Sequence, residues 1–332
     1  MRSSALIDSY GRTHDYLRIS LTDKCNLRCF YCMPEEGIEL KNRDSYMSAD
    51  EVIQIATTFV DLGVKKIRLT GGEPLVRKDV GEIIARLSEL PIELCLTTNA
   101  ILLHKYIPLL KEHGVSKLNV SLDSLDAVKN LFIVKRDEFT RIMNNIELLM
   151  QEGIYPKLNV VLIKDLNDDE IISFVELTKK YPIDVRFIEF MPFNGNQWNM
   201  ERCVSDAEVL EKVHLHYGPA SVIPIKNEPN YTAREYKVEG YQGSFGLIST
   251  VTEPFCASCN RLRLTADGKL KNCLFGIDES DLLSACRNGL DLVPLIEANV
   301  KQKKAERGGL DFGSELDLIE AEKNRSMISI GG

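Results

Sequence analysis

The sequence predicts an α/β fold, a partial (β/α)6 TIM-like barrel of parallel strands that a C-terminal domain closes. Six short apolar segments alternate with segments of helical period, which is typical of a parallel sheet. Conspicuous polar residues follow the expected strands, where a parallel barrel places its functional loops. After residue 193 turn residues become dense, so we predict a barrel domain over 1–193 and a second domain over 194–332.

The six expected strands span residues 16–21, 64–70, 92–98, 116–122, 157–163 and 184–190. One intervening helix begins after Ser48, which forms a capping box with Glu51, and ends at Gly63. Another spans about 138–152. In the C-terminal part we expect strands at 235–238, 244–249 and 262–265 and helices at 281–287 and about 290–304. The basic residues Lys301, Lys303, Lys304 and Arg307 are most simply a solvated helix face.

The amino-acid composition limits the classes of function that the chain can have. The net charge of −8 argues against nonspecific nucleic-acid binding, so an anionic substrate would need a local basic pocket. The chain shows neither an apolar signal segment nor a run of eighteen apolar residues, which predicts a cytoplasmic protein without a membrane partner. Nine cysteines in that compartment favour metal or redox chemistry over disulfides.

Three cysteines, Cys25, Cys29 and Cys32, lie within eight residues in a Cys-x3-Cys-x2-Cys array. Three thiolates can hold three irons of a [4Fe–4S] cluster and leave the fourth iron open for chemistry. The alternative, three buried core thiols, is improbable at this spacing. The array resembles that of the radical S-adenosylmethionine (SAM) superfamily, in which the open iron binds SAM and one electron cleaves it to a 5′-deoxyadenosyl radical.

One further motif and two single residues fit SAM binding. The stretch Gly71-Gly72-Glu73-Pro74 follows the second expected strand and would pass for an ordinary turn by itself. Downstream of the cysteine array it resembles the superfamily's motif for the amino group of SAM. Ser121 and Met191, at the ends of two later strands, match further SAM contacts, although a strand-end hydrogen bond and simple packing also explain them.

A second array, Cys256, Cys259 and Cys273, has the spacing Cys-x2-Cys-x13-Cys. It suits a zinc ribbon with Cys286 as fourth ligand, or a second three-cysteine iron–sulfur cluster. We favour the cluster because Cys286 falls in the expected helix 281–287. Arg261 and Arg263 lie two residues apart on an extended segment, point the same way and can present their guanidinium forks to phosphate.

Together these motifs resemble the GTP 3′,8-cyclase family, which catalyses the first step of molybdenum cofactor biosynthesis, over essentially the whole chain. The stretches 15–20, 68–74, 119–126, 186–191, 255–265, 268–270 and 273–276 and the final two glycines match it. Two small departures are Ala100, where glycine is usual, and the form of residues 131–136.

The resemblance implies a role for each matched residue. Cys25, Cys29 and Cys32 would hold the SAM cluster, and Cys256, Cys259 and Cys273 a second [4Fe–4S] cluster whose open iron binds guanine. The implied SAM contacts are Tyr31, Gly72, Glu73, Ser121 and Met191. The implied GTP contacts are Arg18, Arg68, Thr97, Lys157, Arg261, Leu262 and Arg263. Arg261, Arg263, Gly331 and Gly332 would take part in catalysis, with the glycine tail guiding the cyclisation inside the cavity.

The implied reaction turns GTP into (8S)-3′,8-cyclo-7,8-dihydroguanosine 5′-triphosphate: the radical abstracts the ribose 3′-hydrogen, C3′ adds to guanine C8, and reduction gives the cyclised product. The implied partners are a reducing donor such as flavodoxin or ferredoxin and the downstream cyclic pyranopterin monophosphate synthase, with the chain a monomer or homodimer. Two alternatives stay open. Another radical SAM enzyme with an auxiliary cluster, such as a peptide maturase, would usually need more C-terminal cysteines. A noncatalytic protein with two zinc sites would leave the Gly-Gly-Glu-Pro motif unexplained.

Overall fold

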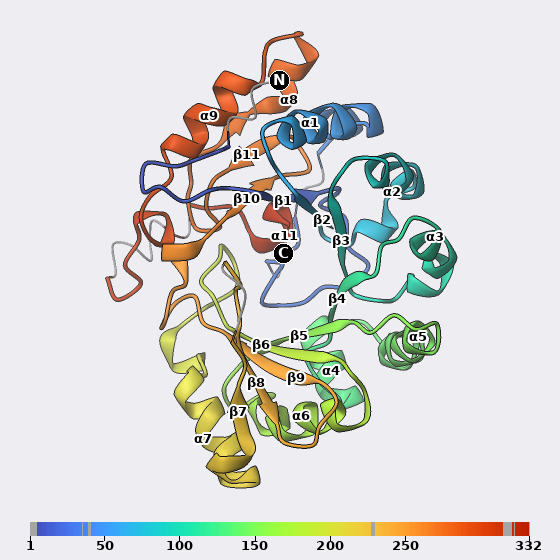
Figure 1. Cartoon of the computed structure of the whole chain (residues 1–332), viewed down its shortest axis with the longest axis vertical. Helices are drawn as coiled ribbons and strands as arrows, with labels where there is room; N and C mark the ends of the chain where they lie inside the picture. The colour runs from blue at the N-terminus through green and yellow to red at the C-terminus, as the bar shows by residue number, and fades with distance from the viewer. Residues whose placement is uncertain are drawn as a thin grey trace.

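The computed structural model describes residues 5–34, 36–38, 41–226, 230–314, 321 and 323–331. Its centre is a curved sheet in which six parallel strands follow one another in chain order (Figure 1). These are β1 (Tyr16–Ser20), β2 (Lys66–Thr70), β3 (Glu93–Thr98), β4 (Lys117–Ser121), β5 (Lys157–Leu162) and β6 (Asp184–Glu189). All six predicted strands are therefore confirmed, each to within two residues at either end.

The strands of the C-terminal part extend this sheet at both edges. β10 (Arg261–Leu264) pairs in parallel with β1, and β9 (Ser244–Ile248) pairs in parallel with β6. Antiparallel strands complete the edges: β11 (Lys269–Lys271) and β12 (Ser280–Asp281) on one side, β8 (Arg234–Val238) and β7 (Val222–Pro224) on the other. The residues after 193 thus share one twelve-stranded sheet with the barrel, and the boundary at 193 stays a prediction.

Helices surround the outside of the sheet (Figure 1). They are α1 (Ala49–Asp61), α2 (Val80–Ser88), α3 (Ile107–Glu112), α4 (Ala127–Val134), α5 (Phe139–Gln151), α6 (Ile171–Lys180), α7 (Asp206–Tyr217), α8 (Leu282–Arg287) and α9 (Val293–Lys301). The short helix α11 (Met327–Ile330) instead lies inside the ring of strands, next to the C-terminus. Single 3-10 turns are η1 (Arg43–Ser45), η2 (Pro74–Val76), η3 (Leu103–Lys105), η4 (Asp168–Glu170), η5 (Met200–Arg202), η6 (Pro219–Ser221), η7 (Cys256–Ser258) and η8 (Arg307–Gly309). The capping box of Ser48 and Glu51 forms as predicted. None of the described helices is long and apolar enough to cross a membrane.

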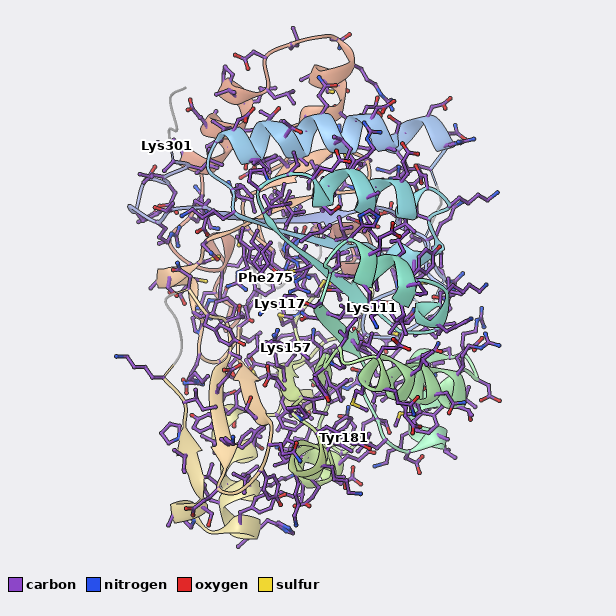
Figure 2. All side chains as sticks on the ribbon, turned by 45° about the vertical axis from the view of Figure 1, so that its right-hand side comes forward. Lys111, Lys117, Lys157, Tyr181, Phe275 and Lys301 are labelled. Atoms are coloured by element: carbon purple, nitrogen blue, oxygen red, sulfur yellow. The ribbon has the colours of Figure 1, made fainter. Side chains whose placement is uncertain are left out.

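The main hydrophobic core lies between the sheet and these helices, and the inside of the barrel is polar. In β1, Leu17 and Ile19 are fully buried in that core, together with Val52 and Ile55 of α1. Because side chains alternate along a strand, Arg18 and its counterparts on the other strands face the barrel interior. Figure 2 places Lys157 of β5 near the centre of the molecule and Lys301 of α9 at its edge. The polar interior is therefore the natural place for a site.

One helical prediction needs correction. α9 ends at Lys301, and Lys303, which we expected on a solvated face, has only 4% of its surface exposed. The positive charges of residues 301–307 consequently do not form one surface stripe. Ala100 also has a physical explanation: its φ is +66°, a left-handed conformation that glycine adopts at no cost.

Candidate active site

A cavity of about 170 Å3 opens at the carboxyl ends of the barrel strands. It is lined by all three cysteines of the first array and all of the expected SAM contacts: Cys25, Cys29, Cys32, Tyr31, Gly72, Glu73, Ser121 and Met191. Residues from four separate parts of the sequence meet there because parallel strands end at one edge of the sheet. Met327, from near the C-terminus, completes the wall.

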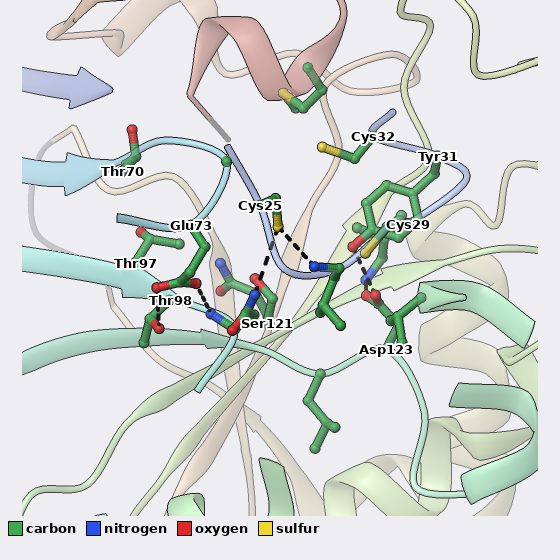
Figure 3. Close-up of a pocket in the computed structure, with 18 of the residues that line it drawn as sticks. Cys25, Cys29, Tyr31, Cys32, Thr70, Glu73, Thr97, Thr98, Ser121 and Asp123 are labelled. Carbon is green, nitrogen blue, oxygen red and sulfur yellow. Dashed lines mark hydrogen bonds between the residues drawn. The ribbon is translucent and has the colours of Figure 1, made fainter. Parts of the chain in front are cut away.

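The first array forms a loop whose thiols face this cavity (Figure 3). The Cys25 Sγ accepts hydrogen bonds from the Leu27 N–H at 3.4 Å and from the Asn99 side-chain amide at 3.8 Å. Burial raises the pKa of Cys25 to about 11 and that of Cys29 well above its ordinary value. Coordination to a metal deprotonates a thiol, so bound iron would remove this cost, and the array fits an iron–sulfur cluster.

Within the described residues, no three His, Cys, Asp or Glu side chains converge on a position for a single metal ion.

Glu73 is the buried acid of the cavity. Its side chain accepts hydrogen bonds from the Asn99 N–H at 2.7 Å, the Leu75 N–H at 3.0 Å and the Thr98 hydroxyl at 2.9 Å. Burial raises the pKa of Glu73 to about 7, although these donors oppose the shift. The carboxylate is thus held in place at considerable electrostatic cost, which a ligand's ammonium group would offset.

The two glycines before Glu73 are required by close packing. A Cβ atom on Gly72 would lie 2.5 Å from the carbonyl oxygen of Lys24, and one on Gly71 would lie 2.7 Å from that of Thr22. The Gly72 N–H donates to the Thr22 carbonyl at 2.7 Å. Besides bordering the cavity, the motif therefore holds the segment that leads into Cys25.

Tyr31 is oriented by Asp123, an acid whose position at a strand end is visible in the sequence but for which the sequence indicates no role. The Tyr31 hydroxyl donates to Asp123 at 2.8 Å, and the other oxygen of Asp123 accepts the Val161 N–H at 2.9 Å. Burial raises the pKa of Asp123 to about 6. Asp123 is the second residue after β4, at the strand end where a parallel barrel places functional residues.

Among the described residues of the barrel interior, several buried polar atoms have no hydrogen-bond partner, and two of these residues, Thr97 and Asn159, line the same cavity. Thr97 Oγ1, Asn119 Oδ1, Asn159 Oδ1, Arg186 Nε and Arg261 Nε are all in this state. Leaving such a group unsatisfied costs about 1–3 kcal/mol, so their concentration in one interior indicates a polar ligand. Asn119, Asn159 and Arg186 were not predicted as site residues. The signal was available, because each occupies the third position of its strand, between two apolar residues.

Three arginines are crowded together in this interior. Arg18 of β1 lies in register with Arg263 of β10, and Arg261 lies two residues before it. Burial and the charges of Arg18 and Arg261 lower the pKa of Arg263 well below its ordinary value. A guanidinium remains charged in proteins, so the lowered pKa means that the three arginines repel one another. A bound polyanion would relieve this repulsion.

The other residues expected to contact GTP differ in how far their side chains are already engaged by partners within the protein. Arg68 donates to the Tyr16 hydroxyl at 2.7 Å and to the Leu96 carbonyl at 2.9 Å. Lys157 forms an ion pair with Asp184 at 2.6 Å. Leu262 is fully buried in the main core, on the opposite face of β10 from Arg261 and Arg263, so only its backbone is near the interior.

The second array also comes together, with cationic neighbours that we did not foresee. The Lys303 ammonium donates to the Cys259 Sγ at 3.4 Å, and the Arg307 N–H donates to the Cys256 Sγ at 3.4 Å. Burial opposes ionisation of Cys259, but Arg261 and Lys303 outweigh it and lower the pKa of Cys259 to about 6. Lys303 is therefore part of a thiolate site, which corrects its interpretation as solvated.

Cys286 lies apart from that array. It is buried in the main core within α8, and the charged groups that influence its ionisation are Glu51 and Arg287. The three cysteines Cys256, Cys259 and Cys273 instead influence one another. This arrangement disfavours the zinc ribbon that would have used Cys286 as its fourth ligand.

The C-terminal tail enters the barrel beside these arginines. Arg263 donates to the Gly331 carbonyl oxygen at 2.7 Å. Gly331 has a φ of +86°, and a Cβ atom there would lie 2.6 Å from the Thr70 hydroxyl and 2.9 Å from the Ser20 Cβ. Glycine is thus required at this position both by conformation and by space. Gly332 lies outside the described residues.

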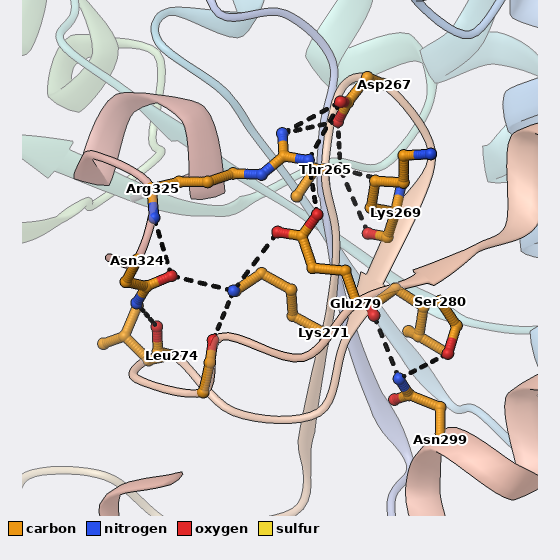
Figure 4. A network of polar contacts seen from close by, with 12 residues as sticks. Thr265, Asp267, Lys269, Lys271, Leu274, Glu279, Ser280, Asn299, Asn324 and Arg325 are labelled. Atoms are coloured by element: carbon orange, nitrogen blue, oxygen red, sulfur yellow. Dashed lines mark hydrogen bonds and ion pairs between the residues drawn. The ribbon is translucent and has the colours of Figure 1, made fainter. Parts of the chain in front are cut away.

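A polar network fixes the tail before it enters (Figure 4). Arg325 donates to both oxygens of Asp267, at 2.9 and 3.1 Å, and to Glu279 at 2.6 Å. Next to it, the Asn324 side chain accepts from Lys271 at 3.0 Å and donates to the Leu274 carbonyl at 3.0 Å. These charge-assisted contacts tie the tail to the β10–β11 region.

Comparisons with known proteins agree with this geometry. The family model described as Radical SAM superfamily matches residues 19–178, and the one described as Molybdenum Cofactor Synthesis C matches residues 183–308. The chain is 48% identical to "GTP 3',8-cyclase, mitochondrial" of Arabidopsis thaliana, over 99% of this chain and 84% of that protein. It is 42% identical to "GTP 3',8-cyclase" of Peptoclostridium acidaminophilum, over 99% of each.

Two other similarities are partial. The chain is 44% identical to "Molybdenum cofactor biosynthesis protein 1" of Homo sapiens and covers 51% of its length, so it spans about half of that protein. The crystal structure of Streptococcus suis SuiB bound to S-adenosylmethionine superposes with a TM-score of 0.64, covering 96% of this chain and 78% of that one. At 16% identity this likeness shows the fold alone.

Proposed function

From the membership of this chain in the GTP 3′,8-cyclase family of radical SAM enzymes, we propose that it converts GTP to (8S)-3′,8-cyclo-7,8-dihydroguanosine 5′-triphosphate for molybdenum cofactor biosynthesis. The enzyme is a radical SAM lyase that uses SAM and an iron–sulfur cluster. The bound cluster supplies the electron that cleaves SAM, and the protein binds, orients and shields the reactants. Hydrogen abstraction at the ribose 3′ position is followed by addition of C3′ to guanine C8, and a second electron from the reductant, with a proton, would convert the cyclised radical to the product.

The observation that carries this proposal is the crowding of buried guanidinium groups in the barrel. A chain of net charge −8 concentrates Arg18, Arg261 and Arg263 in its interior, where they repel one another. A nucleoside triphosphate brings several negative charges and many acceptor oxygens, so its binding turns this repulsion into charge-assisted hydrogen bonds. Thr97, Asn119 and Asn159 then offer neutral partners for the ribose and base.

The two cysteine arrays have different proposed functions, one in SAM binding and the other in GTP binding. Cys25, Cys29 and Cys32 hold the cluster that binds SAM, with Glu73 on the amino group and Tyr31, Gly72, Ser121 and Met191 on the rest of the molecule. Cys256, Cys259 and Cys273 would hold a second [4Fe–4S] cluster, which would supply a binding position for the guanine end of GTP. The low pKa of Cys259 supports this assignment, because metal ligation needs the thiolate.

The tail completes the site. Gly331 accepts from Arg263, an arginine that also faces the substrate chamber, so the ordering of the tail and the binding of GTP share a residue. Gly331 and Gly332 are proposed to steer the ribose radical toward guanine C8 and to have no part in SAM cleavage.

The proposed chemistry also indicates the compartment and the partner proteins of the enzyme. Nine cysteines outside disulfides, six of them proposed cluster ligands, favour a reducing compartment such as the cytoplasm. A low-potential carrier such as flavodoxin or ferredoxin supplies electrons, and cyclic pyranopterin monophosphate synthase consumes the product.

The direct test is anaerobic incubation of the reconstituted protein with GTP, SAM and dithionite, followed by mass spectrometry of the nucleotides. Cys25→Ala should abolish 5′-deoxyadenosine release, whereas Cys256→Ala should keep much of it and lose the cyclised product. Iron analysis should give about eight irons per chain. One zinc with about four irons would contradict the second cluster, and no cyclised GTP from the fully loaded protein would contradict the proposed reaction.

A further inference from the structure

A groove of about 600 Å3 lies behind the first cysteine loop. One wall is the loop itself, represented by Arg28 and Phe30, and the other is the end of α4 with Phe132, Lys135 and Arg136. Arg202 closes it. The groove is distinct from the cavity that holds the SAM residues, since the two have no lining residue in common.

The groove is positively charged in a negatively charged protein. Its lining contains four cations, Arg28, Lys135, Arg136 and Arg202, and no acidic residue. Among the ion pairs of the described residues none involves any of these four. Such a patch, in a chain of net charge −8, attracts an acidic partner to one place on the surface.

Aromatic and apolar side chains accompany the charges. Phe132 is 54% exposed, and Val128 and Leu131 on the same helix are 77% and 44% exposed. The Lys135 ammonium lies 4.2 Å from the centre of the Phe132 ring. Exposed apolar groups beside an uncompensated charge patch are typical of a protein-binding surface.

The groove is structurally continuous with the cluster loop. The Arg28 N–H donates to the Val134 carbonyl at 2.9 Å, and the Phe30 N–H donates to the Ile133 carbonyl at 3.2 Å. The rings of Phe132 and Phe30 are 6.1 Å apart, and those of Phe30 and Tyr31 are also 6.1 Å apart. A protein bound in the groove therefore contacts the chain segment that carries Cys29 and Cys32.

We propose that this groove is the docking site of a small acidic electron-carrier protein that reduces the cluster of the first array. The inference rests on the proposed function, which requires a reductant at that cluster. One electron passes from the reduced carrier to the cluster, so the carrier is oxidised by one electron and the cluster reduced by one. The match of charge predicts fast, salt-sensitive and weak association, as in other electron-transfer pairs.

The test measures binding separately from catalysis. Oxidised flavodoxin, as the acidic probe, is titrated into anaerobically reconstituted enzyme, and its Kd is measured at low and at high ionic strength. The variant is Lys135→Glu with Arg136→Glu, which spares Arg28 because that side chain donates to the Cys25 and Leu27 carbonyls. The matched control is Lys179→Glu with Lys180→Glu, two exposed lysines of α6 outside the groove.

We expect the wild-type Kd to rise with salt, the groove variant to bind at least about tenfold more weakly and the control to bind within about twofold of wild type. Dithionite-driven 5′-deoxyadenosine formation and iron content should be the same in all three proteins. Equal flavodoxin binding by groove variant and wild type, or no binding by wild type at low salt, would overturn the docking site.

Two further outcomes of these experiments would have different meanings. A groove variant that sediments as a different oligomer from wild type would mean that a second copy of the chain covers the groove, which also overturns the proposal. Loss of the cyclised product in wild type with dithionite would count against the proposed function alone, because the binding measurement does not depend on it.

Discussion

At the scale of single residues, the site is built from groups whose ionisation is unfavourable until a ligand arrives. Glu73 is the clearest case: it is buried, accepts three hydrogen bonds and still has a pKa of about 7. An ammonium group beside it favours the charged form, so binding and deprotonation are linked.

SAM affinity should accordingly depend on pH. Binding of the SAM ammonium lowers the pKa of Glu73 below its value of about 7 in the empty site. The affinity should therefore increase as the pH rises from 6 through 7 and level off near 8. Glu73→Gln should remove this dependence and weaken binding by about tenfold or more. Equilibrium binding to anaerobic enzyme measures both effects, with exposed Glu89→Gln as the control; a flat wild-type profile would contradict the assignment.

The thiols of the two arrays should differ in reactivity before clusters are inserted. The pKa of Cys259 is about 6, and that of Cys25 is about 11. In cluster-free protein at pH 7, iodoacetamide should therefore modify Cys259 first, with a rate that is half-maximal near pH 6. Lys303→Met removes one neighbouring cation and should move that midpoint toward the ordinary thiol value of about 8.5.

Peptide mass spectrometry follows the modification of each cysteine in that experiment. Lys301→Met is the matched control, because Lys301 is exposed. If both lysine variants react like wild type, Lys303 does not activate Cys259.

At the scale of elements, the C-terminal tail is the part that depends most on its surroundings. The short helix α11 and Gly331 are held by the Arg325 network on one side and by Arg263 on the other. Neither contact is local in sequence, so the tail is ordered by the rest of the fold.

Replacing Gly331 with alanine should separate the two halves of the reaction. The new Cβ would clash with Thr70 and Ser20, and the φ of +86° disfavours alanine, so the tail should leave the barrel. We expect 5′-deoxyadenosine formation to persist while the cyclised product falls at least about tenfold, assayed together by liquid chromatography. Gly289→Ala is the control, because it has a similarly positive φ but open space around it. Normal product from Gly331→Ala would show that the tail is dispensable.

At the scale of the whole molecule, charge is segregated: an acidic chain surrounds a basic chamber. The mutual repulsion of the arginines lowers the stability of the empty protein. Because a bound polyanion relieves this repulsion, the same charges favour binding. Stability and binding therefore oppose each other at these positions, as is common in active sites.

Arg261→Ala should show this opposition. Without ligand, its melting temperature should equal or exceed that of wild type, because one repelling charge is gone. GTP at 100 times its Kd should stabilise wild type by about 2.7 kcal/mol, and the same GTP concentration should stabilise Arg261→Ala far less. Anaerobic differential scanning calorimetry with and without GTP measures both. A variant with a lower melting temperature and undiminished GTP stabilisation would mean that Arg261 has only a structural role.

The sequence by itself determined the fold class, the strands and the two cysteine arrays. Local patterns were sufficient for these, because the period of the apolar residues, the capping box at Ser48 and the cysteine spacings are properties of short stretches. They also identified residues such as Glu73 and Arg261, whose motifs are contiguous.

Only the tertiary structure decided which distant residues meet and what each then experiences. Sequence placed Lys303 on a solvated face, whereas the fold buries it beside Cys259, 44 residues away. It could not indicate that the strands after residue 193 flank both edges of one sheet, or that Gly331 contacts Arg263. The physical reason is that burial, repulsion and pairing depend on distances in space, which strand order and register set and which no local pattern contains.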